Sequence, residues 1–287
     1  MSTLYVVATP IGNLGDISTR CRETLEQADF IAAEDTRVTM KLTAHFDIHT
    51  PLVSCHQHNE KDKSQSIVER MLREDLDVAL VTDAGTPAIS DPGTYLVRRA
   101  AENGIPVMAV AGPSAMAAAM SVSGFDLTEF AFCGFLPREK KDLEEKLRDL
   151  GQRYPGAIVH ESPYRIKELV GAVCRVLPDA LLSLSCDLTK LHELTIRGTP
   201  ESILARLEAN AKAEKGEYCM VMDLRNVPRE EAKEVSSASP EAQILECMLG
   251  GMELRQAREK LMENGVKKNV AYAAAIKVKN WLEGEEE

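Results

Sequence analysis

The sequence predicts an α/β protein of two α/β domains followed by a small helical region. In its first part, short apolar runs that are typical of buried strands alternate with helical patterns, as in a parallel sheet. The alternation restarts near residue 129, and a Ser-, Glu- and Ala-rich stretch then precedes a region with helical spacing only. We expect domains at residues 1–123 and 124–227, a linker at 228–240 and a helical tail at 241–287.

The first domain is predicted from five apolar runs and the helical patterns between them. The expected strands are residues 4–8, 30–33, 52–55, 77–82 and 106–111. The expected helices are residues 16–27, residues 61–74, a helix from about residue 92 and residues 116–121. Ser90 or Asp91 should cap the third of these helices, because Pro92 suits a first helical position.

Three of these strands end in loops rich in Gly and Pro. The loops are T-P-I-G-N-L-G-D at 9–16, the stretch 82–93, and A-G-P-S-A at 111–115. Gly85 can adopt backbone angles closed to other residues, and Pro87 cannot donate to a sheet ladder, so the chain must leave the sheet near Asp83. Ligands bind at the carboxyl ends of parallel strands, so the loop at 82–93 is a candidate ligand cradle, with a rigid connection as the alternative. The first loop matches neither the dinucleotide nor the P-loop fingerprint.

The second domain and the tail follow from the same patterns. The expected strands are residues 130–135, 157–160, 180–185 and 218–224. The expected helices are residues 137–150, a helix that ends at residue 174 and residues 200–213. The tail should contain three helices, at residues 241–249, 253–264 and 267–282.

Composition restricts the partners and the compartment. The net charge of -11 and the aromatic content of 5% disfavour non-specific nucleic-acid binding and an aromatic platform for bases. A nucleic-acid partner would need a local basic patch, and residues 253–279 offer one, with seven basic against three acidic residues. A solvated helix face is the alternative. The seven scattered cysteines and the lack of a long apolar run predict a soluble cytoplasmic protein without membrane contact.

Six ordered motifs point to one family. They are the loops at 9–16 and 111–115, V-T-D-A-G-T-P-x-I-S-D-P-G at 81–93, E-D-T-R at 34–37, H-x-H-N-E at 56–60 and L-T-K-x-H-E-x-x-x-R-G at 188–198. Over essentially the whole chain they resemble the tetrapyrrole methylases. The resemblance implies a two-domain enzyme that binds S-adenosylmethionine in a cleft between its domains, usually as a homodimer. The branch that it is most similar to methylates the ribose 2′-oxygen of a cytidine in the decoding region of 16S rRNA, within the 30S subunit.

The resemblance also implies the cofactor-binding residues. They are Pro10, Ala84, Gly85, Thr86, Ile89, Ser114, Ala115, Ser162 and Leu188. Relatives usually read R-E-L-T-K where this chain has Cys186 and Asp187, so a role for a Glu at that point does not carry over.

Methylation of a hydroxyl also needs a proton acceptor or a nearby cation. The charged candidates are Lys190, Glu161 and Arg37, with Asp35 beside Arg37. We expect Lys190 to lie near the hydroxyl and Arg37 to hold a phosphate as a bidentate donor. An ordinary surface ion pair is the alternative for each of these residues.

Three other functions compete with this interpretation. The first is a methylase of a tetrapyrrole-like small molecule, and the second is an rRNA-binding assembly factor without catalysis. The third is a metal-dependent phosphohydrolase, whose candidate ligands are Asp35, Asp83, Asp91, His56 and His58. Methyl transfer from a sulfonium needs no metal, so we expect no metal site.

Overall fold

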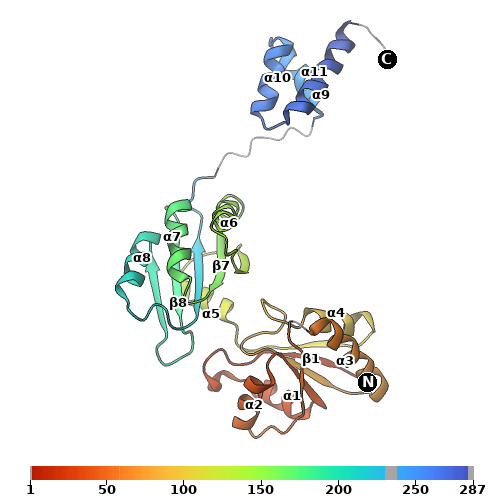
Figure 1. The fold of residues 1–287 in the computed structure, drawn as a ribbon, viewed down its shortest axis with the longest axis vertical. Coiled ribbons are helices and arrows are strands. Elements are labelled where there is room, and N and C mark those ends of the chain that lie inside the picture. Colours follow the sequence, from red (N-terminus) through yellow and green to blue (C-terminus); the bar gives the residue numbers. More distant parts are fainter. Residues whose placement is uncertain (1, 58, 230–237, 284–287) are drawn as a thin grey trace. The chain divides into compact units, whose positions relative to one another are not determined.

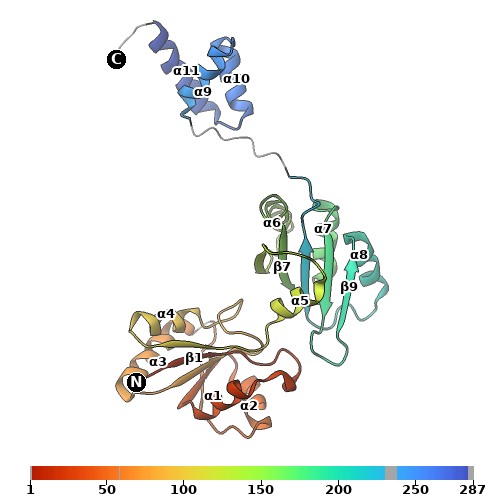
Figure 2. The same ribbon diagram turned by 180° about the vertical axis from the view of Figure 1, so that it is seen from behind.

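The computed structural model describes residues 2–57, 59–229 and 238–283 (Figures 1 and 2). It divides into two compact units, Met1–Pro228 and Arg229–Glu287. The predicted boundary between residues 123 and 124 lies inside the first unit and stays a prediction, as do the limits of the linker. None of the described helices combines the length and the apolar character that a membrane span requires.

The first sheet is parallel throughout, as the alternating pattern predicts. Its strands are β1 (Leu4–Val7), β2 (Phe30–Ala33), β3 (Leu52–Ser54), β4 (Val78–Val81) and β5 (Val107–Val110). Their order is β3-β2-β4-β1-β5, and Val6 of β1 pairs with Leu80 on one side and Ala109 on the other. The three strands that end in Gly/Pro loops are therefore neighbours, so their loops gather at one edge of the sheet.

Helices cover both faces of this sheet (Figure 1). They are α1 (Thr19–Gln27), α2 (Thr36–His45), α3 (Glu60–Glu74) and α4 (Thr94–Glu102). Alternate strand residues point to opposite faces, so Leu80 packs with α3 and α4 while Val81 packs with α1. Two apolar cores follow, one on each side of the sheet.

Two helix starts differ from the prediction, and one helix was not predicted. The 3₁₀ turn Leu14–Asp16 comes first and Ser18 caps α1, so α1 begins later than residue 16. The segment of α2 was not recognised because its β-branched residues lower helix propensity, although Asp35 caps it through the N–H of Arg37. The predicted cap of α4 was wrong, because its N-cap residue is Gly93, which has no side chain to cap with.

The second sheet is mixed. Its strands are β6 (Ala131–Phe135), β7 (Gly156–Glu161), β8 (Leu181–Cys186), β9 (Leu194–Gly198) and β10 (Tyr218–Asp223). Their order is β6-β7-β10-β8-β9; β6 and β7 are parallel, and the other pairs are antiparallel. The unpredicted strand β9 lies at the edge and has no fully buried residue, so its sequence lacks an apolar signal. The last strand of the unit, β10, occupies the centre.

Helices again lie on both faces of the second sheet (Figure 2). They are α5 (Ala115–Ser123), α6 (Lys140–Arg153), α7 (Ile166–Val176) and α8 (Pro200–Ala209). The helices α6, α7 and α8 share the larger core, whereas Ala119 of α5 packs with Ile158 and Val221 on the other face. The predicted helix at 200–213 is too long, because Asn210 leaves the helical conformation.

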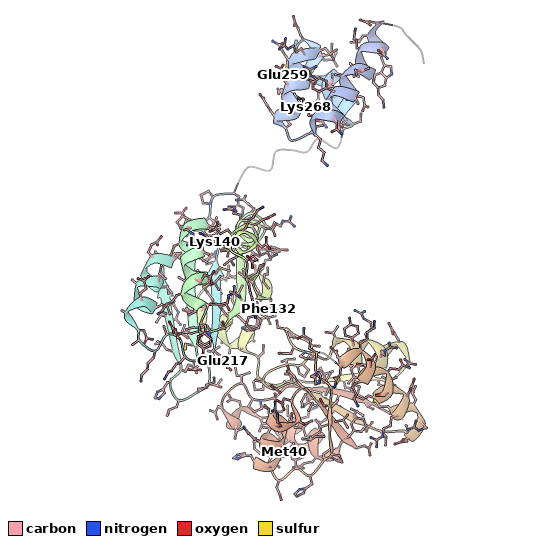
Figure 3. All side chains as sticks on the ribbon, viewed as in Figure 1. Met40, Phe132, Lys140, Glu217, Glu259 and Lys268 are labelled. Atoms are coloured by element: carbon pink, nitrogen blue, oxygen red, sulfur yellow. The ribbon has the colours of Figure 1, made fainter. Side chains whose placement is uncertain are left out.

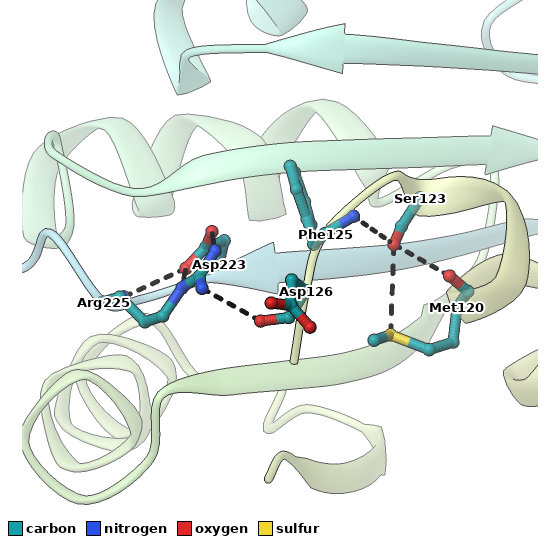
Figure 4. Close-up of polar contacts among 6 residues, drawn as sticks. All are labelled: Met120, Ser123, Phe125, Asp126, Asp223 and Arg225. Carbon is teal, nitrogen blue, oxygen red and sulfur yellow. Dashed lines mark hydrogen bonds and ion pairs between the residues drawn. The ribbon is translucent and has the colours of Figure 1, made fainter. Parts of the chain in front are cut away.

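The connection that follows α5 is anchored to the central strand (Figure 4). Gly124 ends α5 with a φ of 76°, and the hydroxyl of Ser123 accepts the N–H of Phe125 at 3.1 Å. Farther along, Arg225 binds both carboxylate oxygens of Asp223 and donates to the carbonyl of Asp126 at 2.9 Å. Arg225 therefore ties the connecting segment to the end of β10.

The tail forms three helices around a small apolar core, as predicted. They are α9 (Pro240–Leu249), α10 (Leu254–Glu263) and α11 (Lys268–Glu283). Part of the basic excess is neutralised inside this unit: Lys277 pairs with Glu241 at 3.4 Å. Other pairs join Arg255 to Glu259 and Lys279 to Glu283. The tail is thus less cationic as a surface than its sequence alone indicates.

Candidate active site

The three Gly/Pro loops are joined to one another by their main chains. Thr9 donates its N–H to the carbonyl of Gly85 at 2.8 Å, and Gly85 returns a bond to Thr9 at 3.0 Å. The hydroxyl of Thr86 donates to the carbonyl of Pro113 at 3.3 Å. The loops after β1, β4 and β5 therefore form one framework, as expected for a built cradle.

The central loop holds a backbone that its own residues do not favour. Ala88 and Ser90 have φ values of 64° and 65°, in the left-handed region that costs about 1–3 kcal/mol for non-glycine residues. The carboxylate of Glu60, which is only 5% exposed, accepts the N–H groups of Gly93 at 2.9 Å and of Tyr95 at 2.7 Å. A side chain of α3 therefore caps α4 and fixes the end of the loop.

This contact gives the H-x-H-N-E motif a structural role. The backbone N–H of His56 donates to the side-chain oxygen of Asn59 at 2.8 Å, and this bond shapes the turn that leads into Glu60. His58 lies outside the described residues. The end of the motif therefore acts on the loop after β4, whereas a role of the motif in RNA binding stays a prediction.

A cavity of about 380 Å³ lies where these loops approach the second sheet. The residues that line it are Ile11, Ala84, Ile89, Ser90, Asp91, Ala115, Phe135, His160, Glu161, Ser162, Pro163, Leu188, Glu217, Tyr218 and Cys219. A smaller cavity of about 50 Å³ shares Ile11, Ala84, Ile89, Asp91, Ala115 and His160 with it. We call the two together the loop cavity. Its size fits the range of small-molecule sites, roughly 300–1,000 Å³.

The structure brings eight of the nine predicted cofactor residues to the loop cavity. The larger part is lined by Ala84, Ile89, Ala115, Ser162 and Leu188, and the smaller part by Gly85, Thr86 and Ser114 as well. Pro10 lines neither part and is buried, although its neighbour Ile11 lines both. These placements agree with the expected set, while the role of each residue stays a prediction.

Lys190 lies beside the loop cavity in an ion-pair network. Its Nζ is 2.8 Å from Oδ1 of Asp187 and 3.1 Å from Oε2 of Glu217, and Glu217 lines the cavity. Figure 3 labels Glu217. Burial lowers the pKa of Lys190, but the hydrogen bonds and charges of these two carboxylates outweigh it, so the pKa is raised. Lys190 therefore carries a positive charge at neutral pH and cannot accept a proton there. The stem of Lys190 also lies against Gly12, where an added Cβ would be 2.5 Å from Cγ of Lys190.

Glu161 lines the cavity, but its carboxylate is held by neighbouring groups. It is 3% exposed and accepts the N–H of Ser162 at 2.7 Å. Its second oxygen lies 3.5 Å from the guanidinium of Arg165. This arrangement orders the turn that carries Ser162.

The structure does not place Arg37 at the loop cavity. Its guanidinium binds both oxygens of Asp35, at 3.0 and 2.6 Å, and its side chain is 86% exposed. The hydrogen bonds from Arg37 lower the pKa of Asp35 to about 2. Arg37 would therefore have to exchange this partner in order to hold a phosphate.

Two titratable groups of the cavity were not assigned to catalysis from the sequence. Burial, followed by the charges of Glu34 and Asp83, raises the pKa of Asp91 to about 6. Burial lowers the pKa of His160, whose ring packs against Phe132 and Phe135 at centroid distances of 5.3 and 6.0 Å. The signal for His160 was its position at the carboxyl end of an apolar strand.

The phosphohydrolase alternative gains no support from the described residues. Among them, no three His, Cys, Asp or Glu side chains gather closely enough to hold a metal ion. Asp35 and Asp83 are neighbours, but the oxygen of Asp83 accepts the backbone N–H of Asp35.

Comparisons with known proteins agree with this geometry. The model of the family described as Tetrapyrrole (Corrin/Porphyrin) Methylases matches residues 3–204. The chain belongs to this family. The resemblance seen in the six motifs is therefore confirmed.

Curated relatives of this methylase cover almost its whole length. A Halalkalibacterium halodurans protein is 39% identical over 94% of this chain and 93% of its own. A Synechocystis protein is 38% identical over 92% and 93%, and a Pseudomonas aeruginosa protein is 37% identical over 96% and 96%. Each of the three is named ribosomal RNA small subunit methyltransferase I.

Solved structures show the same fold at lower sequence identity. Diphthine synthase matches with a TM-score of 0.57 and 14% identity, over 77% of this chain and 89% of its own. Uroporphyrin-III C-methyl transferase from Thermus thermophilus, solved with S-adenyl homocysteine, matches with a TM-score of 0.54 and 16% identity, over 77% and 96%. The predicted fold class of this methylase is therefore confirmed.

Proposed function

We propose that this chain is an S-adenosylmethionine-dependent methyltransferase that methylates the ribose 2′-oxygen of a cytidine in the decoding region of 16S rRNA. The observation that carries the proposal is the similarity to the rRNA methyltransferases, which extends over 94% of this chain and 93% of the Halalkalibacterium halodurans protein. Membership of a methylase family and a cavity lined by the expected loops support the same activity.

The loop cavity suits the cofactor because main-chain groups and small side chains line it. The paired loops offer main-chain groups at close range, and Ala84, Gly85 and Ala115 present no long side chain to the space. We assign cofactor binding to these residues together with Thr86, Ile89, Ser114, Ser162 and Leu188. When bound, S-adenosylmethionine supplies a methyl group on a sulfonium, which carries a good leaving group. The remaining task of the protein is to orient the acceptor and to remove its proton.

We assign proton acceptance to Asp91. It lines both parts of the loop cavity, and a carboxylate whose pKa lies near neutral accepts a proton better than an ordinary one. His160 lines the same space and is the second group there that can accept a proton at neutral pH.

Lys190 serves as the cation. Its raised pKa keeps the ammonium charged, so it can stabilise negative charge that develops on the ribose oxygen as the proton leaves. Asp187, at the position where relatives usually carry Glu, holds the ammonium at 2.8 Å. The shorter acid therefore still reaches its partner in this chain.

The proposed substrate also indicates the particle and the compartment in which the enzyme acts. We propose that it acts on the 30S subunit in the cytoplasm, as a homodimer and without membrane contact. The names of the relatives support a ribosomal substrate, and the dimer rests on the family resemblance alone.

One experiment tests the whole proposal. Purified protein is incubated with labelled S-adenosylmethionine and 30S subunits from cells that lack this methylation, and the modified ribose is then mapped. We expect label on one cytidine of the decoding region. Label on a porphyrinoid instead of the 30S subunit would favour the small-molecule methylase, and no transfer to either would contradict the proposal.

A further inference from the structure

A second and larger cavity opens beside the loop cavity in the second sheet. It measures about 730 Å³ and lies among β8, β9, α8 and the segment that follows α8. Its apolar residues are Leu184, Cys186, Leu194, Ile196, Leu207 and Tyr218, and its polar ones are Asp187, His192, Arg206, Asn210, Lys212 and Lys215. We call it the β9 cavity. The cofactor and the catalytic groups assigned above leave it unused.

The cations of the β9 cavity are available to a ligand. Within residues 59–229, Arg206, Lys212 and Lys215 take part in no ion pair. The acid of the cavity, Asp187, is already bound to Lys190 at 2.8 Å. The cavity therefore presents three uncompensated positive charges in a chain whose net charge is -11.

Three acidic side chains on α8 and in the segment that follows it interact with α7. The pKa of the Cys174 thiol on α7 is raised mainly because the thiol is buried, and the charges of Glu201 and Glu208 on α8 raise it further. Glu214 pairs with Lys167 on α7 at 3.7 Å. Arg206, Lys212 and Lys215 therefore line the cavity, whereas these three acids interact with groups on α7.

The β9 cavity is also coupled to the reaction site. Tyr218 lines both cavities, and its hydroxyl is held by the carbonyl of Ala213 at 2.9 Å. Lys190 bridges Asp187 of the β9 cavity and Glu217 of the loop cavity, at 2.8 and 3.1 Å. A chain-like substrate that places one unit in the loop cavity can therefore place a neighbouring unit in the β9 cavity.

We propose that the β9 cavity binds a nucleotide of single-stranded RNA that flanks the methylated one. The apolar residues Leu194 and Ile196 of β9 contact the base, and Arg206, Lys212 and Lys215 bind the adjoining phosphates. Unpaired cations beside an apolar floor match a nucleotide, because its phosphate is anionic and its base has an apolar face. This inference rests on the proposed function, because it names how the same substrate is held.

The test compares two triple variants of the full-length protein. Arg206→Ala/Lys212→Ala/Lys215→Ala removes the cations of the β9 cavity. Arg138→Ala/Lys140→Ala/Lys141→Ala removes the same three charges from exposed positions that line neither cavity (Figure 3 labels Lys140). Binding to unmethylated 30S subunits is measured over a series of salt concentrations, with calorimetry for S-adenosylmethionine and light scattering for the mass.

In the β9-cavity variant, the plot of log affinity against log salt should become less steep by about 2, since each single-strand phosphate contributes about 0.7. Between 0.1 M and 1 M salt, the affinity of the wild-type protein should therefore fall about 100-fold more than the affinity of the β9-cavity variant. The control variant should keep the wild-type slope, and both should bind the cofactor normally. Equal slopes in the two variants would overturn the inference, and so would a change of mass that accompanies the loss, because it would indicate a contact between copies.

The binding measurement needs no catalysis, so it separates this inference from the proposed function. Wild-type protein that binds 30S subunits but transfers no methyl group would contradict the proposed function and leave the salt slopes decisive for the cavity. Wild-type protein that methylates, together with a β9-cavity variant of unchanged slope, would contradict the inference alone.

Discussion

The contact of Glu60 with the start of α4 predicts that one side chain of α3 controls both stability and cofactor binding. Its carboxylate accepts two backbone N–H groups, at 2.9 and 2.7 Å, in a site that is 5% exposed. Hydrogen bonds to a charged group contribute about 1.5–3 kcal/mol each. We expect Glu60→Ala to lower the free energy of unfolding by about 3 kcal/mol, the lower end for two such bonds.

Glu60→Gln keeps an oxygen acceptor and removes only the charge at the helix start. We therefore expect a loss of about 1 kcal/mol, the size of a charge effect at a helix N-terminus. Denaturant unfolding measures the stability of both variants, and calorimetry measures their binding of S-adenosylmethionine. Binding should weaken more in Glu60→Ala than in Glu60→Gln, because residues 84–89 lose their anchor at Gly93. The control is Glu69→Ala on the exposed face of α3, which should change stability by less than about 0.5 kcal/mol. Equal stability of Glu60→Ala and Glu69→Ala would refute the capping argument.

Four further outcomes follow from the site. Gly12→Ala should lower kcat by about 100-fold, because the added Cβ would lie 2.5 Å from Cγ of Lys190 and displace the ammonium. Cofactor affinity should change little. Single-turnover kinetics measures the rate, and calorimetry measures the affinity. Lys190→Ala should lower kcat by about 100- to 1,000-fold, and undiminished methylation would remove its assigned role. The rate should rise with pH up to about 6 and then level off, because Asp91 must lose its proton to act as acceptor; Asp91→Asn should abolish that rise in a pH profile and leave only a slow reaction. Deletion of residues 241–287 should weaken 30S binding more than cofactor binding, and equal losses in the two titrations would count against an RNA role for the tail.

The sequence predicted the parallel sheet well because its strands are rich in apolar residues. Each reads as a short apolar run, so their limits came within about two residues, and the Gly/Pro loops marked their carboxyl ends. The edge strand β9 and the helix α2 were missed because neither carries a strong local signal. Their structure depends on pairing with Leu181–Cys186 and on the cap at Asp35.

The candidate site was predictable where backbone geometry defines it and less so where side chains meet across the chain. The loop residues Ala84 and Ala115 lie at the cavity as expected. The predicted cap of α4 failed because the true capping group, Glu60, precedes the helix by more than thirty residues. The raised pKa of Asp91 depends first on burial and then on the charges of Glu34 and Asp83, and no local pattern reveals that the fold buries Asp91 near these carboxyls.

The position of β10 has a consequence for biosynthesis. A nascent chain that ends before Tyr218 contains β6, β7, β8 and β9 but lacks the strand that joins the two pairs, so it has two separate two-stranded fragments with open edges. Such a product would expose backbone that other chains can recruit, and it is a natural target for proteases. A chain that ends after Pro228 has every strand of both sheets. Residues 218–228 therefore separate a truncation that is expected to aggregate from one that has every strand.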